Sequence, residues 1–89
     1  MKVFDCKHII IWIDNKGFNN RMKIKLHGVQ CPERTTIKGK QARAFVKKTI
    51  YGKMIDIEIV KRRFWGWSDA IIYCNGLCLN RTVQSKWKH

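Results

Sequence analysis

Residues that could carry out acid–base chemistry are scarce in this chain, in which 19 Lys and Arg outnumber 6 Asp and Glu. One acid, Glu33, follows Pro32 in the stretch GVQCPE, between a lysine-rich apolar segment and a run of basic and hydroxyl residues. A positioned carboxylate can activate water as a general base. It can equally be a loop residue that contacts the next helix or pairs with a nearby Arg, and both interpretations of Glu33 are open.

A second stretch, KRRFWGWS at 61–68, places cations beside aromatic rings. This pattern suits single-stranded nucleic acid, because bases stack on rings while Lys and Arg contact phosphates, and each stack contributes about 1–3 kcal/mol. The alternative is that Phe64 and one Trp pack into the core. Three aromatic residues on so short a connection predict at least one exposed ring. The residues predicted here to contact nucleic acid are Lys61, Arg62, Arg63, Trp65 and Trp67.

The rest of the chain is also strongly basic, with a formal net charge of +13 and a sequence pI near 10.1. A field of this sign concentrates polyanions and favours nucleic acid as the partner, although an acidic protein would satisfy it too. Lys23 and Lys25 alternate with apolar residues and would share one face of a strand. We assign Lys7, Lys23 and Lys25 to the nucleic-acid contacts, against the alternative of a solvated strand face.

The four cysteines lack the close pairs that are typical of structural zinc sites. If Asn75-Gly76 forms a two-residue turn, Cys74 pairs with Leu77 and Tyr73 with Cys78. The two cysteines of this hairpin then point to opposite faces and cannot share a metal ion. We expect no metal site, and buried free thiols instead.

The hydrophobic pattern predicts three strands, one helix and two more strands in a single domain, residues 1–89, with a short basic tail at 81–89. Strict alternation favours strands at 22–26 and 54–60, and an apolar run favours one at 3–13. A helical stripe predicts a helix over about Lys38 to Tyr51, with Gly52 as its C-terminal cap. The tail is expected to be irregular or one helical turn. This order predicts an α+β, mostly β fold, a five-stranded antiparallel OB-fold barrel with one helix between strands 3 and 4.

Three motifs then occur in a recognisable order: GVQCPE, GKQARAFVKKTIYGKMIDIEI and WGWSDAIIYCNGLCLN. Together, over about Lys23 to Asn80, they resemble the staphylococcal-nuclease-like (thermonuclease) family, which reads roughly G-V-D-T-P-E, then G-x-E-A-x-x-F, then Y-G-R with a closing V-N. The resemblance implies an OB barrel and a phosphodiesterase that cuts DNA and RNA with calcium.

The resemblance also assigns positions in the site. Glu33 matches the glutamate that handles the attacking water, and Gln30 stands where one metal-binding aspartate would be. If Asp5-Cys6-Lys7-His8 aligns with the turn that carries the other, Lys7 replaces that ligand. Lys25 corresponds to one of the two phosphate-binding arginines, and Trp67 to the second. Glu33 and Lys25 are therefore the catalytic candidates that the resemblance leaves.

These replacements imply a degenerate catalytic site. Calcium takes about six to eight oxygen ligands, several of them charged, and a lysine in the site would repel it. Loss of one preorganised electrostatic group typically lowers the rate about 100- to 1000-fold. We therefore expect no cofactor, with calcium bound only if catalysis survives.

Our leading hypothesis is a small basic thermonuclease-like protein that binds single-stranded DNA or RNA without cutting it. One alternative is an active metal-dependent nuclease with a rearranged site around Glu33, Asp5 or Asp14. Another is a structural or scaffolding component of a larger assembly, such as a particle shell or ribonucleoprotein. The N-terminal apolar run is too short for a signal peptide, and no stretch approaches about 20 apolar residues. These features predict an intracellular protein that does not engage membranes, with a virion or phage context open.

Overall fold

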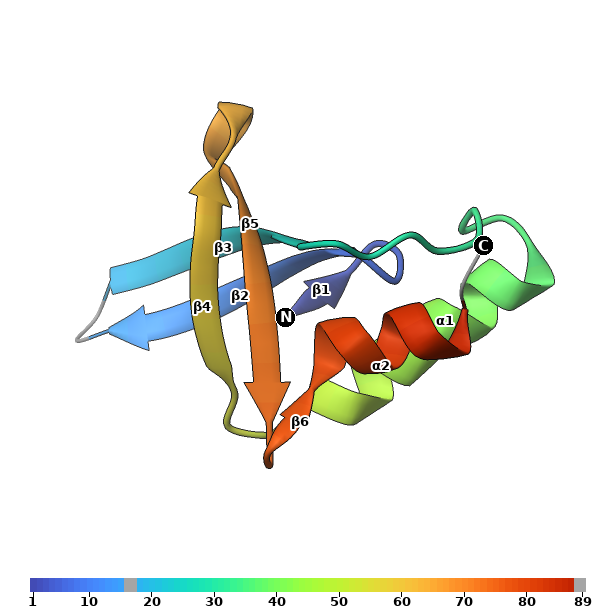
Figure 1. Cartoon of the computed structure of the whole chain (residues 1–89). Helices are drawn as coiled ribbons and strands as arrows, with labels where there is room; N and C mark the ends of the chain where they lie inside the picture. The colour runs from blue at the N-terminus through green and yellow to red at the C-terminus, as the bar shows by residue number, and fades with distance from the viewer. Residues whose placement is uncertain (16–17, 88–89) are drawn as a thin grey trace.

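The apolar run at 9–13 and the alternating apolar residues at 22–26 both lie in strands. The computed structural model describes residues 1–15 and 18–87, with only the backbone at 13–15, 18–20 and 64. In it, β2 (His8–Asn15) and β3 (Phe18–Leu26) pair antiparallel from His8↔Lys25 to Asn15↔Phe18. The described elements, shown in Figure 1, are β1 (Lys2–Val3), β2 (His8–Asn15), β3 (Phe18–Leu26), α1 (Ile37–Ile50), β4 (Asp56–Arg62), a 3-10 turn (Phe64–Gly66), β5 (Trp67–Cys74), β6 (Leu77–Cys78) and α2 (Leu79–Lys86). The fold is α+β and mostly strands, as predicted.

The sheet is mixed and open, which corrects the predicted antiparallel barrel. Its strand order is β1-β2-β3-β5-β4, with β6 paired to β5. β3 and β5 run parallel, from Lys23↔Trp67 to Leu26↔Ala70, while the other paired strands are antiparallel. Parallel neighbours need a long crossover connection, and α1 with β4 supplies it. Among the described residues, no ladder joins β4 to β1 and closes the sheet.

The segment 3–13, in which the apolar run predicts a strand, contains the end of β1 and most of β2, separated by a turn. The Asp5 carboxylate accepts hydrogen bonds from the backbone N–H groups of Lys7 (2.9 Å) and His8 (2.7 Å). Such local bonds hold the backbone out of the sheet ladder. β1 is consequently only two residues long, and Arg43 of α1 ties it to the helix by donating from Nε to the Val3 carbonyl oxygen at 2.7 Å.

The helix between β3 and β4 confirms its prediction to within one residue at each end. Thr36 caps α1, because its hydroxyl oxygen accepts the Gly39 N–H at 3.0 Å, and Gly52 follows the helix with a φ of 69°. Ala42, Val46 and Ile50 form its buried face. Ile37, the first residue of α1, is 77% exposed.

The Asn-Gly hairpin is confirmed in register and turn geometry. Asn75 and Gly76 have φ angles of 52° and 78°, and Cys74 pairs with Leu77. The tail is more helical than predicted, because α2 occupies residues 79–86, longer than the single turn expected, and packs beside α1 (Figure 1), with Leu79 and Val83 fully buried. The buried core comprises Val3, Cys6, Ile9, Ile24, Leu26, Val29, Ala42, Val46, Ile50, Ala70, Ile72, Leu79 and Val83.

Candidate nucleic-acid interface

A groove of about 620 Å³ opens between the β2–β3 strands and the β4–β5 connection, and we call it the basic groove. It is lined by His8, Lys25, Lys61, Arg62, Arg63 and Trp67. None of these lining residues is acidic. Within the described part of the chain, no hydrogen bond or ion pair holds the side chains of Lys25, Lys61 or Arg62. These three cations are therefore available to a ligand.

The strand register brings these distant residues together. His8 lies opposite Lys25 in the β2–β3 ladder. The parallel β3–β5 ladder places Lys25 opposite Asp69, and the β4–β5 ladder places Lys61 opposite the same residue. Three ladders thus converge near Asp69, so the groove depends on the parallel pairing that the sequence pattern did not reveal.

Asp69 lines a neighbouring depression that shares Lys25 and Arg63 with the groove, and it is only 3% exposed. Its Oδ1 accepts a hydrogen bond from Arg63 Nε at 2.6 Å, and its Oδ2 lies 3.6 Å from His27 Nδ1. The hydrogen bond from Arg63 is the main reason that the pKa of Asp69 is below its ordinary value, although burial opposes the shift. Asp69 therefore fixes one cation of the groove. Its one signal in the sequence is an acid directly before the mainly apolar run AIIYC.

Trp67 forms the aromatic wall of the groove. The His8 ring packs edge-on against it, with ring centroids 5.3 Å apart and an interplanar angle of 86°. Lys23 Nζ lies 6.0 Å from the Trp67 ring centroid and also donates to the Trp65 carbonyl oxygen at 3.2 Å. Lys23 thus braces the connection at the rim of the groove.

Trp65 stands at the tip of the β4–β5 connection and is 88% exposed, which confirms the expectation of an exposed ring. Its backbone is left-handed, with φ 63° and ψ 27°. That region costs a residue with a side chain roughly 1–2 kcal/mol. The connection therefore holds a large aromatic ring in solvent in a backbone conformation that glycine would adopt more readily.

Lys7 completes the set of predicted contacts from a neighbouring depression. This depression, about 500 Å³, shares Lys25 and Arg63 with the basic groove. Of the eight predicted nucleic-acid contacts, five line the basic groove, Lys23 and Trp65 lie on its rim, and Lys7 extends it. His8 and Asp69 are the additions that the sequence reasoning missed.

Glu33 lies elsewhere, in a shallow depression of about 350 Å³ that Asp5 and Lys7 also line. Glu33 is exposed, and its backbone carbonyl accepts hydrogen bonds from the Thr36 N–H (3.0 Å) and hydroxyl (2.7 Å). Lys25, the other catalytic candidate, lines the basic groove and not this depression. The two catalytic candidates are therefore not brought into one pocket.

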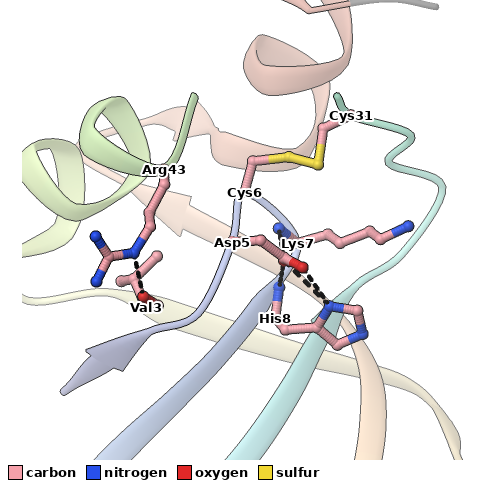
Figure 2. Close-up of polar contacts among 7 residues, drawn as sticks. All are labelled: Val3, Asp5, Cys6, Lys7, His8, Cys31 and Arg43. Atoms are coloured by element: carbon pink, nitrogen blue, oxygen red, sulfur yellow. Dashed lines mark hydrogen bonds and ion pairs between the residues drawn. A yellow bond between two sulfur atoms is a disulfide. The ribbon is translucent and has the colours of Figure 1, made fainter. Parts of the chain in front are cut away.

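Asp5 shares that depression, but its carboxylate is occupied by its own turn (Figure 2). Besides the two backbone N–H groups, the His8 ring nitrogen Nδ1 lies 3.1 Å from both carboxylate oxygens. Burial raises the pKa of Asp5, but these hydrogen bonds outweigh it, so the net shift is downward. The Asp14 side chain is outside the described part of the chain. Among the described residues, no group of three or more His, Cys, Asp or Glu side chains could hold a metal ion.

A disulfide joins the Asp5–His8 turn to the loop that carries Glu33. Cys6 and Cys31 are bonded, with their Cα atoms 6.4 Å apart (Figure 2), whereas Cys74 and Cys78 are free. The prediction of free thiols is thus wrong for one pair. The turn at Asp5 brings Cys6 against the loop, and nothing in a separation of 25 residues indicated that contact.

Comparison with known proteins identifies no family. No family model matches the chain. A similar protein from Capnoides sempervirens, described as "Uncharacterized 38.1 kDa protein", is 30% identical over 66 residues, which is 74% of this chain. The chain spans only 20% of the length of that relative. In the described residues, neither helix is long and apolar enough to cross a membrane.

Proposed function

We propose that this protein binds single-stranded nucleic acid in the basic groove without catalysing its cleavage. The observation that carries this proposal is a groove lined by four Lys and Arg side chains and Trp67, with no acid among its lining residues. Phosphates would contact Lys25, Lys61 and Arg62, and a base would stack on the exposed Trp65 ring. Because phosphate contacts carry no sequence information, little base preference is expected.

The sheet topology supports the same proposal. A helix between β3 and β4, and β5 inserted between β3 and β4, are compatible with a thermonuclease-like OB architecture whose barrel is left open. OB folds bind oligonucleotides on the face of strands 2 and 3 and on the loop between strands 4 and 5. The basic groove lies between these same parts of the molecule. The architecture and the charge distribution therefore support one binding surface.

The test is fluorescence anisotropy of a labelled single-stranded oligonucleotide over a series of salt concentrations. We compare the wild type with a groove variant, Lys25→Ala/Lys61→Ala/Arg62→Ala, and a charge-matched control on α1, Lys38→Ala/Lys40→Ala/Lys48→Ala. Arg63 is kept because it holds Asp69. Each phosphate contact contributes about 0.7 to the slope of log affinity against log salt for a single strand. For the groove variant, which lacks three cations, the magnitude of this slope should be smaller than for the wild type by about 2.

The control separates a specific groove from the general positive field. It removes the same charge from α1 and should keep most of the slope, because those lysines do not line the groove. Equal losses in both variants would refute the groove as the binding site. The anisotropy is also followed over time in calcium and in EDTA. A signal that decays only in calcium would show cleavage and support the nuclease alternative.

A further inference from the structure

The outer edge of β4 is the longest unpaired strand edge of the described sheet. β4 (Asp56–Arg62) is last in the strand order and pairs with β5 on its inner side alone (Figure 1). Edge strands present unpaired backbone N–H and C=O groups to any matching strand. At the other end of the sheet, β1 is only two residues long, which is too short to act as such a template. β4 therefore offers the sheet's main docking edge.

The side chains of β4 are self-complementary. Ile59 and Val60, at its centre, are 38% and 45% exposed. Asp56 and Glu58 precede this apolar centre and Lys61 and Arg62 follow it, so two of the six acids in the chain stand in this one strand. Two copies running antiparallel would place the acidic half of each against the basic half of the other. A parallel arrangement would instead set like charges opposite each other, which is destabilising.

The β-bulge in β4 makes this pairing geometrically consistent. The register shifts between Ile59 and Lys61, so that Glu58 lies opposite Ile71 and Lys61 lies opposite Asp69. Because Ile71 and Asp69 are two residues apart on β5, Glu58 and Lys61 point to the same face of the sheet. Directly opposed residues of an antiparallel pair also share a face. The bulge thus allows Glu58 of one copy to meet Lys61 of another.

We propose that β4 pairs antiparallel with β4 of a second copy of this chain, with Glu58 opposite Lys61 twice and Ile59 opposite Val60. Such an interface is two-fold symmetric and uses the longest free edge of the described sheet in each copy, so the pairing closes as a dimer. Lys61 also lines the basic groove, so in the dimer Glu58 of the second copy would compete with phosphate for Lys61, while Lys25 and Arg62 stay free for phosphate. The pairing stands without the proposed function, since it rests on the strand alone.

The test is sedimentation equilibrium of the full chain without nucleic acid, over a range of protein concentrations. The wild type should approach twice the chain mass of 10.6 kDa. Glu58→Lys alone and Lys61→Glu alone each place like charges opposite at two points, and both variants should remain monomeric. An equimolar mixture of the two should form a heterodimer, since every opposed pair is then of opposite sign. The double variant should dimerise again.

Lys48→Glu, on the exposed side of α1, is the charge-matched control for Lys61→Glu and should dimerise as the wild type does. Recovery of the dimer in the mixture also shows that the single variants are folded. A wild type that stays monomeric at every concentration overturns the proposal. The β4 edge would then be open to pairing with a strand of another protein or with β1 of the same chain. Single variants that dimerise as well as the wild type overturn it too.

Discussion

Two neighbouring regions of the molecule use their polar groups in opposite ways. We call residues 30–36, together with the Asp5–His8 turn, the tethered loop. Its polar atoms bond to the chain itself: the Asp5 carboxylate accepts hydrogen bonds from N–H groups of its own turn, and the Glu33 carbonyl oxygen accepts one from the Thr36 hydroxyl, directly before α1. In the β4–β5 connection, residues 61–67, Asp69 fixes Arg63, while Lys61 and Arg62 line an open groove and Trp65 stands in solvent.

The difference supports the proposal that the β4–β5 connection, and not the tethered loop, receives the ligand. The tethered loop is also fixed by the Cys6–Cys31 disulfide, and its carboxylate at Asp5 already has donors. Cations that line a groove keep their charge for a polyanion, and a Trp held in a costly backbone conformation is a feature often found at functional sites. The tethered loop is therefore expected to govern stability, and the β4–β5 connection to govern binding.

The largest effect that we predict tests the structural role of the tethered loop. Gly39 is buried, and a Cβ at this position would overlap the Glu33 carbonyl oxygen and carbon. Overpacking against backbone costs about 3 kcal/mol, while Ala in place of Gly returns about 1 kcal/mol of helix propensity. Gly39→Ala should therefore lower the free energy of unfolding by about 2 kcal/mol, measured by urea denaturation.

The control for that change is Lys40→Ala, the next residue on the same helix, whose exposed side chain should leave the unfolding free energy nearly unchanged. The folded Gly39→Ala variant should bind the oligonucleotide with wild-type affinity below its unfolding transition. A variant as stable as the wild type would show that the loop does not press on α1. A folded variant that binds the oligonucleotide weakly would show that the tethered loop affects binding as well as stability.

The second prediction concerns the exposed ring of the β4–β5 connection. Trp65→Gly removes a stacking surface but suits the left-handed backbone at this position, with φ 63°. Affinity for the oligonucleotide should fall about tenfold, within the range of about 1–3 kcal/mol for one stacked base. The free energy of unfolding should change by less than about 1 kcal/mol, because relief of backbone strain offsets the flexibility of glycine.

Trp12→Ala is the matched control, since Trp12 is 44% exposed on β2 but does not line the groove. Its removal should change the affinity measured by anisotropy by less than about twofold. An equal loss in both variants would mean that exposed aromatic surface, wherever it lies, contributes to binding. In that case the two variants would give no reason to assign base stacking to Trp65 in the β4–β5 connection.

The two regions also differ in how far the sequence could predict them. The cations and aromatic rings of 61–67 are a local signal in the sequence, and four of these residues, Lys61, Arg62, Arg63 and Trp67, line one groove with Lys25 in an open mixed sheet. The Asn75-Gly76 hairpin and α1 are local as well, since turn and cap residues specify them. The tethered loop depends instead on contacts between distant segments: the Cys6–Cys31 bond, and the approach of Glu33 to Gly39.

The parallel pairing of β3 with β5 could not be predicted from the sequence pattern either, because hydrophobic alternation specifies a strand and its two faces but not the strand beside it. For the same reason, the contact between Asp69 and Arg63 could not be predicted, because it forms where the ladders of β3, β4 and β5 converge. α2 was missed for a related reason. Its eight residues gain stability mainly by burying Leu79 and Val83, and by Asn80, which bonds to the Ile72 N–H and to the Ala70 carbonyl.

The smallest predicted effect is on Glu33, and it tests the separation of the two regions most directly. Glu33→Gln removes one exposed negative charge from the depression that Lys7 shares. Because solvent screens exposed charges, affinity for the oligonucleotide should rise by no more than about twofold, measured by anisotropy at low salt. The signal should be stable over time in calcium for both proteins. If the wild type instead cuts the oligonucleotide and Glu33→Gln does not, the tethered loop is catalytic, and the Glu33 carboxylate takes part in cleavage.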